Sequence, residues 1–146
     1  NELASYTLLP IIKLLGVPKS SIFQHINNEG VDIFAKAIFD FGNAFATSIT
    51  GLKVKREGDL VIAGSKGYIY VPAPWWKTQE FEVRFEDINL NKKFFYAFEG
   101  DGLRYEIAEF SNCIRQRQQE SHLLSLEDSF QIVKIIESFN HQKDII

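Results

Sequence analysis

The chain has 146 residues, of which 45% are hydrophobic and 24% charged, and its formal net charge is −3. This size and balance predict a single domain over residues 1–146 that buries its own core. The chain is weakly negative and therefore lacks the positive field that attracts nucleic acid or an anionic membrane. We expect neither as a partner. One cysteine, Cys113, excludes an internal disulfide framework and favours a reducing compartment, so we expect a cytoplasmic protein. The chain begins at Asn1 and contains no Met, which indicates a piece of a longer chain or a processed product.

The first predicted element is a short helix within residues 5–15. Its apolar residues recur at helical spacing, as Leu8, Ile11, Ile12 and Leu15. Pro10 fits the first turn if the helix starts near Thr7. The stretch is too short to span a bilayer and lacks the cationic start of a signal peptide.

Strands follow. Residues 22–26 are strand-like and end at an Asn-Asn-Glu-Gly turn, and residues 31–41 alternate with period two, which predicts a half-buried strand. The return strand, within 44–54, carries only small residues on one face: Ala44, Ala46, Ser48 and Thr50. We expect this small-residue face to be uncovered and available for packing against a second sheet.

The stretch from Leu60 to Trp76 predicts a hairpin. Two apolar runs flank Gly64-Ser65-Lys66-Gly67, and glycine tolerates the positive φ of tight turns. The second run ends at Pro72-Ala73-Pro74, which cannot continue a ladder. Trp75 and Trp76 follow directly, so this arm either seals a core or lines a pocket. Further strands are expected at 80–86 and 92–98.

The period changes after Gly102. An amphipathic helix is predicted with Leu103, Ile107, Phe110 and Ile114 on one face. Ser125 and Asp128 then resemble a capping box, and the helix that they open is expected to turn Leu126, Phe130, Val133 and Phe139 inward. The predicted fold class is therefore α+β, an open, mainly antiparallel sheet of about six strands with helices packed on one face.

Several ordered segments carry a family resemblance over nearly the whole chain. They are Glu2-Leu3-Ala4-Ser5-Tyr6 with Leu15-Gly16, Gly64–Gly67 with Trp75, Gly100-Asp101-Gly102-Leu103 with Tyr105-Glu106, and Leu124–Ser129. In their order and spacing, the chain resembles the C-terminal domain of the Gfo/Idh/MocA (glucose-fructose oxidoreductase/inositol dehydrogenase) family, within it the dihydrodiol-dehydrogenase-like subgroup.

The resemblance implies a role as the substrate-binding and dimerisation half of an NAD(P)-dependent oxidoreductase that acts on a sugar, polyol or diol. NAD or NADP would be bound mainly by a Rossmann domain that this chain lacks. Gly100-Asp101-Gly102 has no third glycine at the offset of a dinucleotide-binding loop. We therefore do not expect activity from this chain alone, and the resemblance implies a homodimer formed through the open sheet face.

The resemblance also implies two catalytic positions, Tyr6 and Glu2. Tyr6 matches the family's proton-exchanging His or Tyr, and a phenol of pKa about 10 performs that role when a nearby cation lowers the pKa. Glu2 stands where the family has Asp, and Ala4 stands where it has Gly. The alternative for Tyr6 is simple packing at the start of a helix.

Two aromatic residues are candidate substrate-binding residues. Trp75 matches an aromatic that faces substrate in dihydrodiol-type enzymes, and Phe98 precedes the glycine pair in a similar way. A ring face stacks well on the C–H groups of a sugar or diol, but both residues are equally suited to a core. Trp76 is expected to pack. The three histidines lie at no metal-ligand spacing, so no metal site is expected.

Two functions remain open from the sequence. The first is the oxidoreductase half described above. The second is a non-catalytic dimerisation or ligand-binding module derived from such a domain, which the departures at Glu2 and Ala4 favour.

Overall fold

The computed structural model describes residues 2–97 and 99–143. The chain divides into two compact units, Asn1–Lys55 with Gln119–Ile146, and Arg56–Gln118. Each unit contains one antiparallel sheet, so the α+β class is confirmed, with the described strands divided between a three-stranded and a four-stranded sheet. The first unit contains α1 (Glu2–Leu15), β1 (Ser20–Asn28), β2 (Val31–Asp40), β3 (Phe45–Gly51) and α3 (Leu126–Lys143). The second contains β4 (Leu60–Gly64), β5 (Gly67–Val71), η1 (Trp75–Lys77), β6 (Glu80–Phe85), η2 (Ile88–Leu90), β7 (Lys92–Phe95) and α2 (Leu103–Gln116).

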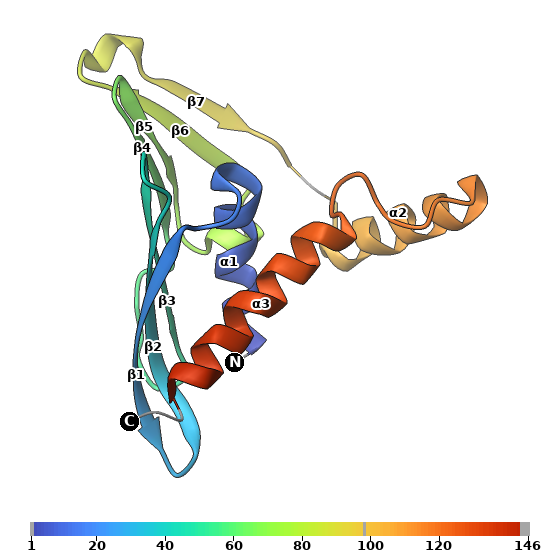
Figure 1. Cartoon of the computed structure of the whole chain (residues 1–146). Coiled ribbons are helices and arrows are strands. Elements are labelled where there is room, and N and C mark those ends of the chain that lie inside the picture. The colour runs from blue at the N-terminus through green and yellow to red at the C-terminus, as the bar shows by residue number, and fades with distance from the viewer. Residues whose placement is uncertain (1, 98, 144–146) are drawn as a thin grey trace. The chain divides into compact units, whose positions relative to one another are not determined.

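In the first unit, the strands β1, β2 and β3 pair in chain order, and α1 and α3 cover one face of their sheet (Figure 1). The β1–β2 turn places Glu29 and Gly30 at φ of 53° and 81°, the conformation of a two-residue hairpin turn with both central residues at positive φ. The Asn27 side chain accepts a hydrogen bond from the Gly30 backbone N–H at 2.9 Å, which closes the turn.

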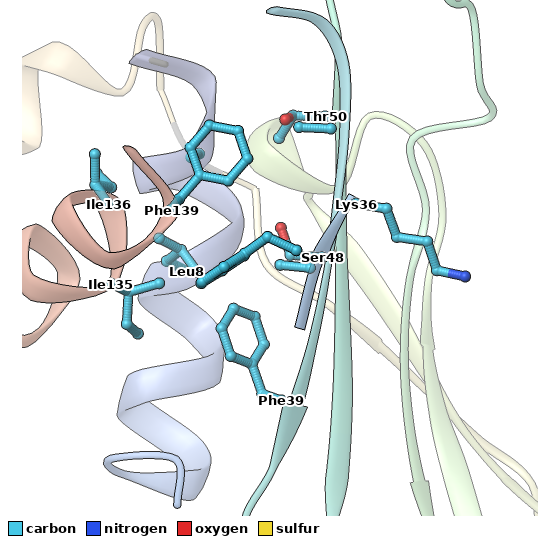
Figure 2. Close-up of a pocket in the computed structure, with 12 residues that line it drawn as sticks. Leu8, Lys36, Phe39, Ser48, Thr50, Ile135, Ile136 and Phe139 are labelled. Atoms are coloured by element: carbon cyan, nitrogen blue, oxygen red, sulfur yellow. The ribbon is translucent and has the colours of Figure 1, made fainter. Parts of the chain in front are cut away.

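The core of this unit lies between the helices and β2. Phe39 is fully buried and contacts Phe23 of β1 edge-to-face, with ring centroids 6.2 Å apart. The core cluster consists of Leu8, Ile12, Phe39, Phe41, Ile132 and Ile135. The period-two alternation of β2 is confirmed, because Ala35 and Phe39 point toward the helices whereas Lys36 points to the opposite side, as Figure 2 shows for Phe39 and Lys36.

The small-residue face of β3 lies under α1, which corrects the expectation that it is uncovered. Ser48 is buried, and its hydroxyl lies 2.6 Å from that of Thr7 on α1. Ala44 and Ala46 pack against the core cluster. Small side chains let a helix backbone approach a strand closely, so their pattern here marks the covered face of the sheet.

The helix α1 begins at Glu2, five residues before the predicted start. Pro10 therefore lies inside the helix, where it has no N–H to donate to the carbonyl of Tyr6. Because leucine and isoleucine on the inward face bury well, packing on the sheet retains the helix across this proline.

The capping box at the start of α3 is confirmed. The Asp128 backbone N–H donates to the Ser125 hydroxyl at 3.0 Å, and the Ser125 backbone N–H donates to the Asp128 carboxylate at 3.2 Å. The Lys13 ammonium also donates to this carboxylate, at 2.9 Å, and so ties α1 to α3.

The predicted inward face of α3 is wrong in three of four residues. Phe139 is buried as expected, whereas Leu126, Phe130 and Val133 are exposed. The residues that face the core are instead Ile132, Ile135, Ile136 and Phe139. The sequence of α3 has apolar residues on two faces, and the sheet covers one of them.

In the second unit, β4, β5, β6 and β7 pair in chain order, which confirms the predicted hairpin. Its glycines have a different role from the one expected, because neither Gly64 nor Gly67 adopts positive φ. A Cβ on Gly67 would collide with the carbonyl oxygen of Arg84 on β6. Glycine is needed there for close approach of two strands.

The helix α2 ends where Arg117 adopts a left-handed conformation at φ 54°, and the Arg117 N–H bonds back to the last turn. Cys113 is buried on one side of the helix, next to Glu109, and burial raises the pKa of its thiol. The predicted apolar face is uncovered: Leu103, Ile107, Phe110 and Ile114 are all exposed. The helix therefore forms as predicted, without covering a sheet through that face.

Candidate functional site

Tyr6, the candidate acid–base residue, projects from α1 into solvent. Its side chain is 61% exposed, so the phenol does not serve as core packing. An exposed phenol can donate a hydrogen bond to, or accept one from, a hydroxyl group of a ligand.

The two departures from the family pattern lie around Tyr6. Glu2 opens α1 one turn before Tyr6, and its side chain lies outside the described residues. Ala4 packs against the core cluster on the opposite side of the helix from Tyr6. The extra methyl of Ala4 therefore faces the core and leaves the exposed side of Tyr6 unobstructed.

A cavity of about 30 Å³ lies between α1, α3 and the sheet of the first unit, lined by Leu8, Ser48, Ile136, Phe139 and their neighbours (Figure 2). Substrate pockets enclose roughly 300–1,000 Å³, so this space is a gap in the core with no room for a sugar or a nicotinamide.

Trp75 lies in η1 of the second unit and is half-buried. Its backbone N–H donates to the carbonyl of Gly58 at 3.0 Å, which fixes the end of the Pro-x-Pro arm. The Trp75 and Trp76 rings meet edge-to-face at 6.2 Å. Trp76 is more exposed, at 54%, although its ring lies over Gly58, where a Cβ would come within 3.1 Å. Both indoles of this arm are therefore accessible to solvent, the Trp75 ring in part and the Trp76 ring more fully.

Phe98, the other candidate substrate-binding residue, lies outside the described residues. The segment after it is closed by side chains of α2. The Tyr105 hydroxyl accepts a hydrogen bond from the Glu99 N–H at 2.9 Å, and the Arg104 guanidinium donates to the Glu99 carbonyl at 2.9 Å.

The same segment tests whether this chain could hold the dinucleotide that the resemblance implies. A pyrophosphate needs glycines whose backbone N–H groups face it at the start of a helix. Here Tyr105 stands where the third glycine would be, and its hydroxyl occupies a backbone N–H of the turn. The described residues at this turn therefore do not fit a dinucleotide.

A cluster on β5 and β6 was not predicted as a site. The Arg84 guanidinium lies 4.6 Å from the Tyr70 ring centroid and 5.8 Å from that of Tyr68. Its Nε donates to Glu82 at 2.7 Å, and the Tyr68 hydroxyl and Glu82 together raise the pKa of Arg84. The sequence signal for this cluster is the spacing by two of Tyr68 and Tyr70 in one strand and of Glu82 and Arg84 in the next. The cluster satisfies its own charges, so we assign it to holding the two strands in register.

Among residues 2–97 and 99–143, no group of three His, Cys, Asp or Glu side chains is placed to hold a metal ion. Within the same residues, no helix combines the length and hydropathy needed to cross a membrane. Tyr6 belongs to the first unit and Trp75 to the second.

No family model matches the chain, and no curated protein matches it. Among solved structures, the chain is similar in fold to YvaA of Bacillus subtilis, which is assigned to the oxidoreductases. The TM-score is 0.71 over 96% of this chain, at 15% sequence identity. The match covers 47% of YvaA, so this chain spans about half the length of that protein.

Proposed function

We propose that the chain is the C-terminal substrate-binding and dimerisation domain of an NAD(P)-dependent oxidoreductase acting on a sugar, polyol or diol. The single observation that carries the proposal is the fold match over 96% of the chain to half of an oxidoreductase-class protein. The motif order that resembles the Gfo/Idh/MocA family agrees with it. At this identity the match itself concerns the fold alone, and the activity is our inference.

Tyr6 is the proposed proton-exchanging residue. A nicotinamide held by a separate domain would supply the hydride acceptor for oxidation of the substrate alcohol. The proton of the hydroxyl passes to the Tyr6 phenolate oxygen. Its exposure on α1 makes it accessible to a bound substrate. A phenol accepts a proton in this role only beside a cation that stabilises its deprotonated form, and that separate domain would have to supply the cation.

Trp75 is the proposed substrate-stacking residue, as is Phe98, and Glu2 is proposed as a further catalytic residue. Trp75 is anchored by its backbone bond to Gly58 and by the edge of Trp76, which presents a preoriented ring to a ligand. An aromatic face that is already ordered loses little entropy on stacking against sugar C–H groups.

The experiment begins with the coding sequence upstream of Asn1. A Gly-rich strand–turn–helix there would predict a complete enzyme, and its NAD(P)-dependent oxidation of polyols and diols is then assayed. We expect Tyr6→Phe to lower kcat by about 10²–10⁴-fold with little change in KM. Trp75→Ala should raise KM several-fold, whereas Trp76→Ala, which removes only the edge contact that orients the Trp75 ring, should raise KM less.

A non-catalytic dimerisation module is the second candidate. The observation that favours it is the apolar outer face of the β1–β3 sheet, where Ile22 and Ile26 are 62% and 55% exposed, since such a face serves association without any chemistry. An unrelated upstream sequence, or a complete protein with no NAD(P)-dependent oxidation of polyols or diols, would exclude the oxidoreductase proposal and leave this one. Full activity in Tyr6→Phe would exclude only the role proposed for Tyr6.

A further inference from the structure

Gly58 contacts both members of the tryptophan pair within the second unit. The unit begins at Arg56, and Gly58 follows two residues later. Its carbonyl oxygen accepts the backbone N–H of Trp75 at 3.0 Å. A Cβ built on Gly58 would lie 3.1 and 3.3 Å from two atoms of the Trp76 ring, which is closer than side chains normally pack. One residue therefore holds the backbone of the first tryptophan and lies directly against the ring of the second.

We propose that Gly58 is the positioning residue of the Trp75 ring, an inference that rests on the substrate-stacking role proposed for Trp75. The hydrogen bond to the Gly58 carbonyl fixes where the Trp75 backbone lies. The bare Cα of Gly58 sets how closely the Trp76 ring approaches. That ring meets the Trp75 ring edge-to-face, with the two planes at 88°. The position of Gly58 is thereby passed through Trp76 to the ring on which a sugar or diol would stack.

The backbone gives Gly58 a second reason to be glycine, because its φ of 77° lies in the left-handed region. The two reasons predict opposite orders for two variants. Backbone strain is larger for Gly58→Ala than for Gly58→Asn, since asparagine tolerates the left-handed conformation better. Crowding of the Trp76 ring is larger for Gly58→Asn, since its side chain is the larger of the two. The order of the two variants therefore separates positioning of the tryptophans from a role in the turn alone.

Tryptophan fluorescence measures the positioning directly, because the chain contains two tryptophans and both lie in this arm. We expect Gly58→Asn to shift the emission to longer wavelength and to increase its quenching by acrylamide, because displaced indoles meet more water. Gly58→Ala should do the same to a smaller extent.

Gly16→Ala is the matched control for backbone strain. Gly16 has a φ of 78°, nearly the value of Gly58, and a Cβ there would meet no other part of the described chain within 4 Å. The control therefore incurs similar strain without touching a tryptophan. Its emission and its quenching should equal those of the wild-type chain.

Removal of the Trp76 ring tests the contact by rescue. In the Trp76→Ala chain no ring lies against Gly58, so adding Gly58→Asn should leave the emission of Trp75 unchanged. Far-ultraviolet circular dichroism shows whether each variant is folded. If Gly58→Asn does not fold, Gly58→Ala is compared in the same way with and without Trp76→Ala.

The functional readout is the KM of the complete protein. Gly58→Asn should raise KM about twofold to fivefold with little change in kcat, because it displaces a ring that only binds the substrate. In a Trp75→Ala protein it should raise KM no further.

Three outcomes would overturn the role of Gly58: an emission that neither Gly58 variant changes, a larger change in Gly58→Ala than in Gly58→Asn, or a rise in KM that is the same with and without Trp75. The fluorescence measurement needs no activity. A complete protein without NAD(P)-dependent oxidation would therefore exclude the proposed function, and the fluorescence would still decide whether Gly58 positions the two rings.

Discussion

Thr7 and Ser48 form the hydrogen bond that joins α1 to the covered face of β3. The Thr7 hydroxyl donates to the Ala4 carbonyl at 3.0 Å, so the Ser48 hydroxyl is the donor in their 2.6 Å contact. We expect Ser48→Ala to lower the free energy of unfolding by about 1 kcal/mol, because a buried hydrogen bond is lost. Chemical denaturation of both single variants and of the Thr7→Val/Ser48→Ala double variant measures their coupling. Strictly additive losses would show that the two hydroxyls do not interact.

Asp128 makes the stability of the first unit sensitive to acid. The Lys13 ammonium, and then the Ser125 hydroxyl, hold the pKa of this carboxyl below its ordinary value. The folded state therefore binds the proton less readily than the unfolded state. The stabilisation is complete above the unfolded pKa of about 3.9 and is lost as pH falls through the depressed folded pKa.

We accordingly expect the wild-type Tm to fall more steeply than that of Asp128→Asn below about pH 4. Lys13→Met should flatten the curve in the same way, since it removes the first of the two causes. Melting curves recorded by circular dichroism between neutral and acidic pH measure the difference. Parallel curves for all three proteins would contradict this assignment.

At the scale of elements, Gly67 is a position where the approach of two strands leaves no space for a side chain. A methyl group there meets the Arg84 carbonyl, so β5 and β6 must separate. We expect Gly67→Ala to destabilise the chain by about 1–3 kcal/mol. Gly64→Ala is the matched control in the same hairpin, because its Cβ would lie 3.3 Å from the nearest carbonyl and needs only a small adjustment. If Gly67→Ala and Gly64→Ala lowered the denaturant midpoint equally, the cause would be the conformation of the turn that they share, and the contact between β5 and β6 would not be the reason.

The elements also show which features of the fold the hydrophobic periodicity of the sequence can predict. The faces of β2 were predictable because Asp32, Lys36 and Asp40 mark one side as polar, and the capping box at Ser125 was predictable from local hydrogen bonding alone. The covered face of α3 was not, because both of its faces are apolar and the pattern does not say which one meets the sheet. The small side chains of β3 were misinterpreted for a related reason: small residues suit a helix as well as a second sheet.

The candidate site was predictable to a smaller extent. The sequence identified Tyr6 and Trp75 through a resemblance, and their exposure and anchoring emerged only with α1 and η1 in place. The Arg84 cluster was visible as alternating charges and tyrosines, but only the β5–β6 register brings Tyr68 opposite Arg84. Long-range register depends on contacts that one strand's sequence does not contain.

At the scale of the whole molecule, the outer face of the β1–β3 sheet is where we propose that the homodimer forms. Ile22 lies opposite Ile38, and Ile26 lies opposite Phe34, so apolar side chains adjoin across β1 and β2 on the face that the helices leave open. We expect Ile22→Lys to weaken dimerisation at least tenfold, since it would bury a charge in the contact. Asn43→Lys adds the same charge in an exposed turn and serves as the control. Sedimentation equilibrium of both variants measures this contact, and an Ile22→Lys chain that dimerises as tightly as wild type would exclude the sheet face as the interface.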